Sequence, residues 1–371
     1  MEVIWRINRS FIMIQDLIGK LAVAFNELFP GVCLDVSRCG AAHVSEVMNF
    51  IENHWKHGHI MAHDIPLVDF MHKSSDGNYN FILGEKAGDG GVVGVLGYIP
   101  TSQYDPSLCK EKDFWLAIWK GIAEPGAGLK LLEPIAEEAD TIAAIGINRH
   151  VAKVYRWLGF DVLRLKQLYL LNDTMPEFSI ARVDRRNPAC LREDCVDVRL
   201  VPVAERELEN VLIETGWRPR KTARYVVNRY LHHPIYRYQV LCARIDGVVK
   251  KDCVFVTRKI TVGTASCLRV VDIVGDFDGL PNLRSAWSSL LAEEGAEFVD
   301  CMEFGLSESE ERILGMAVLD PQGDVIIPNY FEPFLQENIV ITAAVKNPSD
   351  SRYVIFKGDS DQDRPSERPI L

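Results

Sequence analysis

The sequence has no Cys-x-x-Cys pair and no repeated cysteine spacing, although it contains nine cysteines. An odd number of scattered cysteines does not build a disulfide framework, so we expect reduced thiols and a cytoplasmic protein. Dense clusters of lysine and arginine are also missing, and the formal net charge is −11. This charge argues against nucleic acid as a partner, because phosphate backbones are held by basic surfaces.

Long apolar runs are missing as well, since no uncharged stretch approaches the ~18 residues that a membrane span needs. The N-terminal region is apolar but is interrupted by Asp16, Lys20 and Glu27. Its apolar residues recur on one helical face, which predicts an amphipathic helix that packs on a domain, not a signal peptide. We therefore expect small-molecule substrates as partners and no membrane span; the oligomeric state stays open.

With 371 residues, 47% of them hydrophobic, the chain is long enough for two domains of ordinary size. The periodicity predicts a mixed α/β fold in which the order helix, hairpin, strand, helix, strand, helix, strand of the first half recurs in the second. This indicates an internal duplication. The predicted parts are an N-terminal helix (1–30), a first domain (31–175), a linker (176–198), a second domain (199–358) and a polar tail (359–371).

A glycine-rich turn, Gly126-Ala127-Gly128, follows a predicted strand that contains Trp119 and opens directly into a helix. Small residues allow a ligand to approach the backbone, and the unpaired N–H groups and dipole of a helix start attract phosphate. The turn therefore predicts a pyrophosphate site, with an ordinary strand-to-helix turn as the alternative. Its place behind a hairpin, late in the strand order, differs from that of a Rossmann dinucleotide site.

A second motif lies a few residues further on. Asn148 ends a strand, and the following helix carries Ala152 and Tyr155 and closes with Gly159-Phe160. Together with the glycine-rich turn, this spacing resembles the GNAT superfamily of N-acetyltransferases over roughly residues 40–172. The resemblance implies that the coenzyme A part of an acyl-CoA donor lies on the turn and along this segment.

The resemblance also implies roles for single residues. A backbone N–H around Trp119 or Lys120 would stabilise the oxyanion of the tetrahedral intermediate. Lys120 could also replace the basic residue that the family has where Ala123 stands here. Tyr155 would protonate the leaving thiolate, with a core tyrosine as the alternative. Asn148 would bind the pantetheine amides or cap the helix, or do both.

Several histidines lie close together after the second predicted helix. His59 and His63 are four residues apart, as metal ligands on a helix can be. No Cys or Glu pattern accompanies them, and a proline follows, so a polar loop without a metal is the favoured interpretation. We expect His54, Trp55 and His59 to contact the acceptor; His54 and Asp64 are the weak candidates for a general base.

The second half lacks the features of the donor turn. Its equivalent turn, Gly275 to Pro281, carries two aspartates that would repel a pyrophosphate, so we expect a GNAT-like domain that has lost coenzyme A binding. Its cleft face would then hold the acceptor. Near the C-terminus, Lys357 and Arg364 could clamp phosphates, with a solvated tail as the alternative.

Several short segments are similar to tandem GNAT-like proteins of bacterial surface-polysaccharide pathways, such as those of lipopolysaccharide O-antigen. They are 54–60, 96–105, 116–120, 144–148 and the C-terminal Gly-Asp-Ser-Asp-Gln-Asp-Arg-Pro run. This resemblance implies transfer of an acetyl or short hydroxyacyl group, such as 3-hydroxybutanoyl, to the amine of a dTDP-linked 3-amino-3,6-dideoxyhexose. The acceptor contacts expected from it are His54, Trp55, His59, Tyr98, Gln103, Arg352, Lys357 and Arg364.

Two other functions stay open at this point. A tandem GNAT-like aminoacyl or peptide transferase that uses aminoacyl-tRNA is disfavoured by the net charge of −11. A non-catalytic GNAT-like binding protein is kept open by the lack of an evident general base and by Ala123 at the usual basic position.

Overall fold

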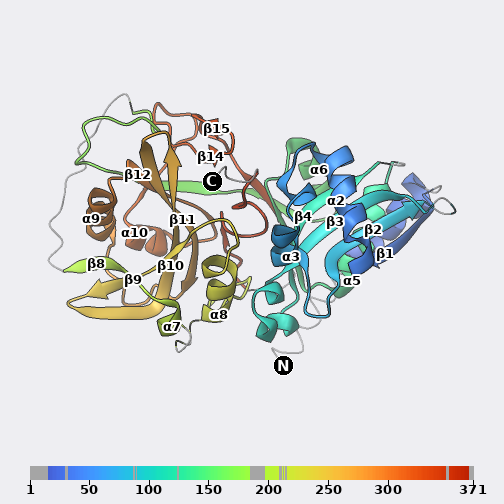
Figure 1. The fold of residues 1–371 in the computed structure, drawn as a ribbon, viewed down its shortest axis with the longest axis horizontal. Coiled ribbons are helices and arrows are strands. Elements are labelled where there is room, and N and C mark those ends of the chain that lie inside the picture. The colour runs from blue at the N-terminus through green and yellow to red at the C-terminus, as the bar shows by residue number, and fades with distance from the viewer. Residues whose placement is uncertain are drawn as a thin grey trace. The chain divides into compact units, whose positions relative to one another are not determined.

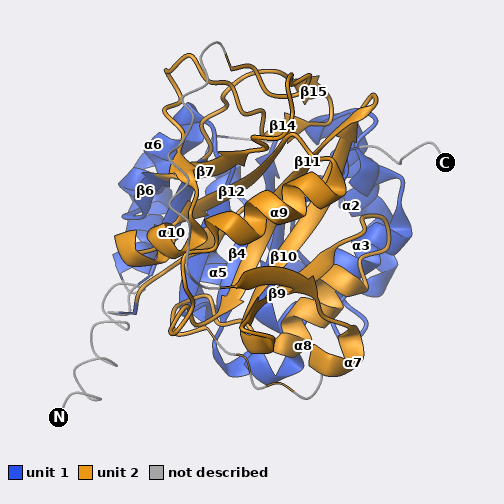
Figure 2. Ribbon diagram, turned by 90° about the vertical axis from the view of Figure 1, so that its left-hand side faces the viewer, with its two compact units in different colours: residues 1–163, 342–351, 360–371 blue, residues 164–341, 352–359 orange. Residues whose placement is uncertain are grey.

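In the computed structural model the chain forms two compact units, which Figure 2 shows in different colours. Unit 1 consists of Met1–Leu163, Thr342–Ser351 and Ser360–Leu371, and unit 2 consists of Arg164–Ile341 and Arg352–Asp359. The residues that the structure describes are 16–29, 32–86, 88, 90–122, 125–183, 197–208, 211, 213, 215–347 and 351–366. Within them, no helix is both long and apolar enough to cross a membrane.

Unit 1 is built on a seven-stranded mixed sheet (Figure 1). In spatial order its strands are β1 (Leu34–Cys39), β2 (Tyr79–Lys86), β3 (Val92–Pro100), β4 (Asp113–Gly121), β5 (Thr141–Ile145), β16 (Thr342–Lys346) and β6 (Asp161–Arg164). The pair β4–β5 is parallel, whereas β1 to β4 pair antiparallel and β16 pairs antiparallel with β5. Phe114, Trp115 and Leu116 of β4 are buried in succession, as expected where both faces of a sheet are covered.

The helices of unit 1 are short. They are residues 16–23, η1 (Ala24–Leu28), η2 (Ala41–His43), α2 (Val44–Phe50), η3 (Ile51–Trp55), η4 (Ile60–Ala62), α3 (Ile65–His72), η5 (Thr101–Gln103), η6 (Pro106–Lys110), α4 (Ala127–Lys130), α5 (Glu133–Glu138) and α6 (Arg149–Trp157). Leu17 and Leu21 of the first helix are buried in one cluster with Leu96, Ile135 and Tyr155. The apolar face predicted for the N-terminal helix thus packs on the core of this unit.

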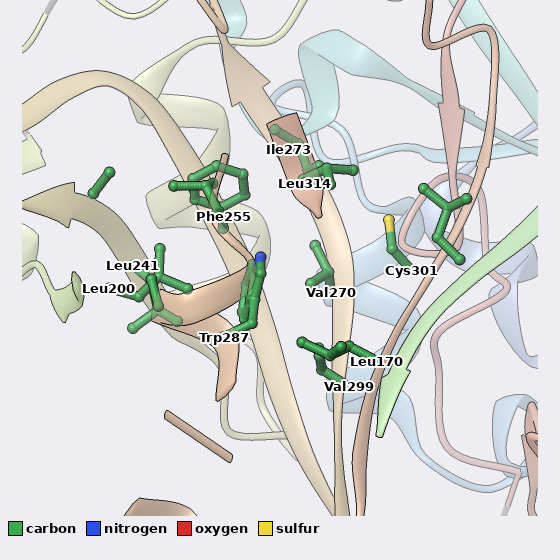
Figure 3. Packing of buried hydrophobic residues seen from close by; sticks show 14 of the residues in the cluster. Leu170, Leu200, Leu241, Phe255, Val270, Ile273, Trp287, Val299, Cys301 and Leu314 are labelled. Carbon is green, nitrogen blue, oxygen red and sulfur yellow. The ribbon is translucent and has the colours of Figure 1, made fainter. Parts of the chain in front are cut away.

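Unit 2 contains an eight-stranded sheet. Its path runs β13 (Ala317–Val318), β7 (Lys166–Leu171), β12 (Phe298–Phe304), β11 (Ala265–Gly275), β10 (Val248–Val262), β9 (Gln239–Ile245) and β8 (Val198–Pro202), and β17 (Ile355–Phe356) pairs with β12. The other elements are β14 (Tyr330–Phe331), β15 (Phe334–Leu335), α7 (Glu205–Leu208), α8 (Ala223–Val226), η7 (Val227–Leu231), α9 (Arg284–Glu294) and α10 (Glu308–Leu314). Figure 3 shows its core, where Phe255 and Trp287 meet edge to face with centroids 5.8 Å apart.

The two sheets share one strand order. Four antiparallel strands lead to a parallel pair, β4–β5 in unit 1 and β11–β12 in unit 2. The next strand comes from the other half of the sequence in both units: β16 follows β5, and β7 follows β12. The predicted mixed α/β fold with a repeated layout is confirmed, and these two strands depart from the predicted domain ranges.

Two further segments differ from the sequence-based expectation. Residues 359–366, predicted to belong to a polar tail, are packed, with Ser360 and Asp361 buried. In the predicted linker, Ile180 and Ala181 are buried in unit 2, where their N–H groups donate to the Glu297 carboxylate at 2.8 and 3.0 Å. Residues 184–196 of that linker lie outside the described residues.

Candidate functional site

The site lies where β4 and β5 of unit 1 separate. Their parallel pairing ends at Leu116–Ala144. At the same level the β3–β4 register shifts, so that two residues of β4, Ala117 and Ile118, stand opposite Gly97. Such a bulge bends the strand and redirects its backbone groups.

A pocket of about 450 Å³ opens at this point. Its wall combines the two strand ends, the glycine-rich turn, α6 and the C-terminal segment. The lining residues are Phe29, Trp55, Leu116, Ala117, Trp119, Gly121, Gly126, Gly128, Leu129, Ala144, Ile145, Gly146, Ile147, Asn148, Val151, Val154, Tyr155, Asp361, Gln362 and Arg364.

The glycine-rich turn has a backbone that favours glycine. Gly126 has a φ of +89°, and a Cβ added there would lie 2.6 Å from a ring carbon of Phe29. A Cβ on Gly121 would lie 2.8 Å from the nitrogen of Gly128, so the end of β4 and the start of α4 cross closely. Of the residues predicted to bind the donor here, Gly126, Gly128 and Trp119 line the pocket, whereas Ala127 is buried and Lys120 is exposed outside it.

Tyr155 of α6 lines the pocket. The residue is 2% exposed, and its ring lies edge to face with Trp119 and Phe160, at centroid distances of 5.5 and 4.9 Å. The hydroxyl makes no hydrogen bond with any residue in the described part of the chain. Burial raises the pKa of Tyr155 far above its usual value, so the hydroxyl stays protonated and can donate a hydrogen bond.

Asn148 caps α6. Its Oδ1 accepts hydrogen bonds from the N–H groups of His150 and Val151, at 2.9 and 3.0 Å, and its side chain also lines the pocket. The helix-cap interpretation is therefore correct, and the cap holds the residue at the pocket wall. Just before it, the N–H groups of Gly146 and Ile147 donate to the carbonyl of Thr342 at 2.9 and 3.1 Å. The first residue of β16 thus fixes this part of the wall.

The C-terminal segment forms the rest of the wall. Ser360 Oγ donates to the carbonyl of Leu116, the last paired residue of β4, at 3.2 Å. Arg364 Nε donates to Asp361 Oδ2 at 3.1 Å. The Gln362 amide lies over Gly146, where a Cβ would come within 2.6 Å of it.

Asp361 is ionised in this setting. Burial by itself would raise its pKa, but the charge and hydrogen bond of Arg364 lower it below the usual value. The sequence singled out Arg364 in this segment but not Asp361 or Gln362. The signals for them were the density of aspartates between residues 359 and 363 and the resemblance of this run to tandem GNAT-like proteins.

The predicted acceptor contacts are dispersed. Trp55 and Arg364 line the pocket. His54 is exposed on η3, with its ring 5.0 Å from that of Phe50. His59 is buried and does not line the pocket. Burial and the charge of Arg364 lower its pKa to about 3, so the imidazole is neutral.

Tyr98 and Gln103 have structural partners in unit 1, outside the pocket lining. The Tyr98 hydroxyl accepts from Arg38 at 2.9 Å, and the Gln103 amide donates to the carbonyls of Phe70 and Lys73 at 3.2 and 2.9 Å.

The other two predicted contacts belong to unit 2. Arg352 forms a bidentate pair with Glu310 at 2.8 Å and lies over the Trp217 ring, and Lys357 is buried.

The histidine spacing does not produce shared ligands. His59 precedes η4 and His63 follows it, and His63 Nε2 lies 2.9 Å from Glu52. Asp64, one of the base candidates, caps α3 by accepting from the N–H of Leu67 at 3.0 Å. Within the described ranges, no group of three or more His, Cys, Asp and Glu side chains is arranged to hold a metal ion.

Unit 2 has a different arrangement where its parallel strands part. β17 pairs with β12 at Glu303 and Phe304, and Gly358 N–H donates to the carbonyl of Val271 on β11 at 2.6 Å. Phe356 of β17 is fully buried in the core of this unit. Residues 355–358 thus occupy the space between the ends of β11 and β12, where unit 1 has its pocket between β4 and β5.

Comparisons with known proteins found similar solved structures, all at low sequence identity. No protein-family model matches the chain, and no curated protein is significantly similar to it. The chain is similar to a GCN5-related N-acetyltransferase from Anabaena variabilis ATCC 29413, with 14% identity, coverage of 85% of this chain and 73% of that chain, and a TM-score of 0.48. It is also similar to a GCN5-related N-acetyltransferase from Kribbella flavida, with 12% identity, coverage of 84% and 70%, and a TM-score of 0.46. A third similar structure is a tandem GNAT protein from the clavulanic acid biosynthesis pathway, with 12% identity, coverage of 86% and 100%, and a TM-score of 0.38. With all three TM-scores below 0.5, these likenesses carry no argument about the activity of this chain.

Proposed function

We propose that this protein is an acyl-CoA-dependent N-acyltransferase whose donor binds in the pocket of unit 1. The observation that carries the proposal is the hydroxyl of Tyr155. The side chain is 2% exposed, no described residue is hydrogen-bonded to the hydroxyl, and the residue lines the pocket at which β4 and β5 separate. A pocket-lining hydroxyl that no part of the described chain engages is available as a hydrogen-bond donor to a bound ligand.

The proposed donor site follows the wall of the pocket. The turn Gly126–Gly128 would receive the pyrophosphate of coenzyme A, because its backbone is open to close approach and a helix start presents N–H groups. Asn148 would contact the pantetheine amides with its Nδ2, since Oδ1 is engaged in the cap of α6. The acyl thioester would then lie beside Tyr155.

The proposed reaction is nucleophilic attack of an amine on the thioester carbonyl. A C–N bond forms, and the carbonyl oxygen becomes an oxyanion that a backbone N–H of β4 near Trp119 or Lys120 would stabilise. β4 has no pairing with β5 in that region, which leaves its edge open to the pocket. The C–S bond then breaks, and the thiolate takes the proton of Tyr155.

For the acceptor, we propose a dTDP-linked 3-amino-3,6-dideoxyhexose of surface-polysaccharide biosynthesis, and for the acyl group acetyl or a short hydroxyacyl such as 3-hydroxybutanoyl. The support is the sequence resemblance together with Arg364, the only cation among the described lining residues. Its Nη2 has no hydrogen-bond partner in the described part of the chain, so a diphosphate could bind there.

The test is to incubate the full chain with acetyl-CoA or 3-hydroxybutanoyl-CoA and with dTDP-3-amino-3,6-dideoxyglucose or its galacto epimer. Acylated sugar and free coenzyme A should form in equal amounts, as measured by liquid chromatography and mass spectrometry. Release of coenzyme A with none of the amino sugars would rule out this acceptor class, and failure to bind acetyl-CoA would rule out the donor.

The Tyr155→Phe variant tests the observation on which the proposal rests. We expect kcat to fall by about 100-fold or more, the usual effect of losing a general acid, while the Kd for coenzyme A stays within about threefold. Tyr169→Phe, which alters a half-buried tyrosine of unit 2, is the control.

A further inference from the structure

Asp361 is the only carboxylate among the described residues that line the pocket, and no histidine lines it. An amine acceptor is an ammonium ion near neutral pH and must lose a proton before it can attack a thioester. The sequence motifs do not identify a residue that would bind this positive charge. Among the described residues of the pocket wall, the carboxylate of Asp361 is the negatively charged group that can do so.

The carboxylate of Asp361 has spare acceptor capacity. Its Oδ2 accepts from Arg364 Nε at 3.1 Å. Its Oδ1 has only two long contacts, with Gln362 Nε2 at 3.3 Å and with Ser360 Oγ at 3.5 Å. Hydrogen bonds to a carboxylate are commonly shorter, at about 2.7–2.9 Å from a charged nitrogen, so an ammonium group can bind Oδ1 more closely than its present neighbours do.

The position of Asp361 is fixed near the point where β4 and β5 separate. The preceding residue, Ser360, is hydrogen-bonded to the Leu116 carbonyl, where the pairing of β4 with β5 ends. Asp361 thus follows directly the residue that is attached to the fork of the two strands. The Tyr155 hydroxyl lines the same pocket from α6.

The charges around Asp361 leave room for a cation. Three groups of unit 1 that interact electrostatically with Asp361 are Arg364, His59 and His72. Burial lowers the pKa of His59 to about 3 and that of His72 to about 4, so both are neutral and Arg364 is the one counter-charge among these groups. The Asp361–Arg364 pair is neutral as a whole, and Oδ1 of Asp361 has only the two long contacts with Gln362 and Ser360.

We infer that Asp361 is the acceptor-binding residue of this enzyme: its carboxylate binds the ammonium group of the amino sugar and so places the nitrogen in the pocket. The inference rests on the proposed N-acyltransferase function. In the step, R–NH3⁺ loses one proton to water, and the free amine forms the new C–N bond. A second proton leaves the nitrogen and restores Tyr155 after that residue has protonated the departing thiolate. The products are the amide, coenzyme A thiol and one proton.

The experiment compares the native chain with Asp361→Asn and Asp361→Glu. Binding of dTDP-3-amino-3,6-dideoxyglucose is measured by calorimetry beside that of dTDP-6-deoxyglucose, which has a hydroxyl in place of the amine. The native chain should prefer the amine by about tenfold, and Asp361→Asn should lose this preference. kcat/KM for the amine should fall by about tenfold or more in Asp361→Asn, in line with the lost preference, and recover in part in Asp361→Glu.

The matched control is Asp363→Asn, which alters a nearby buried aspartate that does not line the pocket. It should keep the preference for the amine. If Asp361→Asn loses affinity for both sugars equally, or keeps the preference, the inference is overturned and Asp361 serves only to position Arg364. A native chain that binds acetyl-CoA but neither sugar overturns the acceptor assignment and leaves the donor site intact, whereas one that binds none of the three overturns the proposed function itself.

Discussion

The indole Nε1 of Trp119 donates a hydrogen bond to the carbonyl oxygen of Gly128 at a distance of 2.6 Å. This bond attaches the end of β4 to the first turn of α4. The same indole lies edge to face with Tyr155, at a centroid distance of 5.5 Å. One side chain therefore sets the positions of both the glycine-rich turn and the tyrosine that line the pocket.

Trp119→Phe should weaken binding of acetyl-CoA by about 2- to 10-fold, the usual effect of one lost hydrogen bond. The phenylalanine ring can still pack on Tyr155, so kcat should change less than the Kd does. Titration calorimetry measures the Kd, and Trp157→Phe, at an exposed position of α6, is the control. An unchanged Kd would show that the hydrogen bond to Gly128 does not shape the donor site.

Gly126→Ala should disturb both the backbone and the packing of the turn. The φ of +89° is strained for alanine, and its Cβ would meet the Phe29 ring at 2.6 Å. We expect a loss of about 2–4 kcal/mol in the free energy of unfolding, as judged from the strain and overpacking terms. Gly247→Ala has a similar φ of +83° but no atom within 4 Å, so it should cost only about 1 kcal/mol. Urea denaturation measures both losses of unfolding free energy. Equal losses in the two variants would show that the contact with Phe29 adds no cost at Gly126.

Lys221→Met should destabilise the chain by about 3–5 kcal/mol. Lys221 Nζ lies 2.7 Å from Asp272 and 2.8 Å from Asp359, and all three side chains are fully buried. Removal of the ammonium group would leave two buried carboxylates without a cation. Adding Asp359→Asn to this variant should recover part of the loss, since it removes one of these charges.

The control for Lys221 is Lys259→Met. Lys259 pairs with Glu294 at 2.9 Å, but these side chains keep 43% and 35% of their surface exposed, so the loss should be below about 1 kcal/mol. Urea denaturation at one pH compares the two variants, and losses of the same size would show that the buried triad contributes no more than a surface pair.

The stability of the Glu303→Gln variant relative to that of the native chain should increase as the pH rises. Burial raises the pKa of Glu303 to about 7, and its Oε1 has no hydrogen-bond partner among the described residues. Because this pKa is higher in the folded than in the unfolded chain, the native form binds the proton more tightly, and stability is lost as the pH rises from about 4.5 through about 7.

Glutamine stays neutral in this position and keeps an acceptor for the Leu306 N–H. The stability of Glu303→Gln relative to the native chain should therefore rise by on the order of 1–3 kcal/mol between about pH 5 and about pH 8. Urea denaturation at both pH values is the measurement. A difference that stays constant with pH would mean that Glu303 remains hydrated in the native state.

The part of the pocket proposed for the donor could be predicted as a cluster because its residues are close in sequence. Trp119, Gly126, Gly128, Asn148 and Tyr155 belong to successive strand–turn–helix units between residues 115 and 160, and all five line the pocket. In such units the spacing of small, polar and apolar residues decides which side chains meet at a strand end. Their roles in catalysis remain part of the proposal.

The acceptor side was not predictable in the same way. Tyr98 of β3 and Gln103 of η5 belong to unit 1 but form hydrogen bonds with residues outside the pocket lining. Arg352 and Lys357 belong to unit 2. Asp361 is far from the donor motifs in sequence, and no local pattern distinguishes a buried aspartate in a polar segment from one in a solvated tail. Its burial depends on contacts with Arg364 and with the segment held by Leu116.

By itself, the sequence determined the mixed α/β class, the repeated layout of the two halves and the motif that encloses the proposed donor site, because all three arise from short-range periodicity and spacing. Only the tertiary structure decided that β16 completes the sheet of unit 1, that β7 lies in the sheet of unit 2 and that residues 360–364 form a wall of the pocket. The reason is physical. A strand's own sequence specifies which faces it can bury, but its neighbour in the sheet is chosen among all strands of the chain by the fit of long-range contacts.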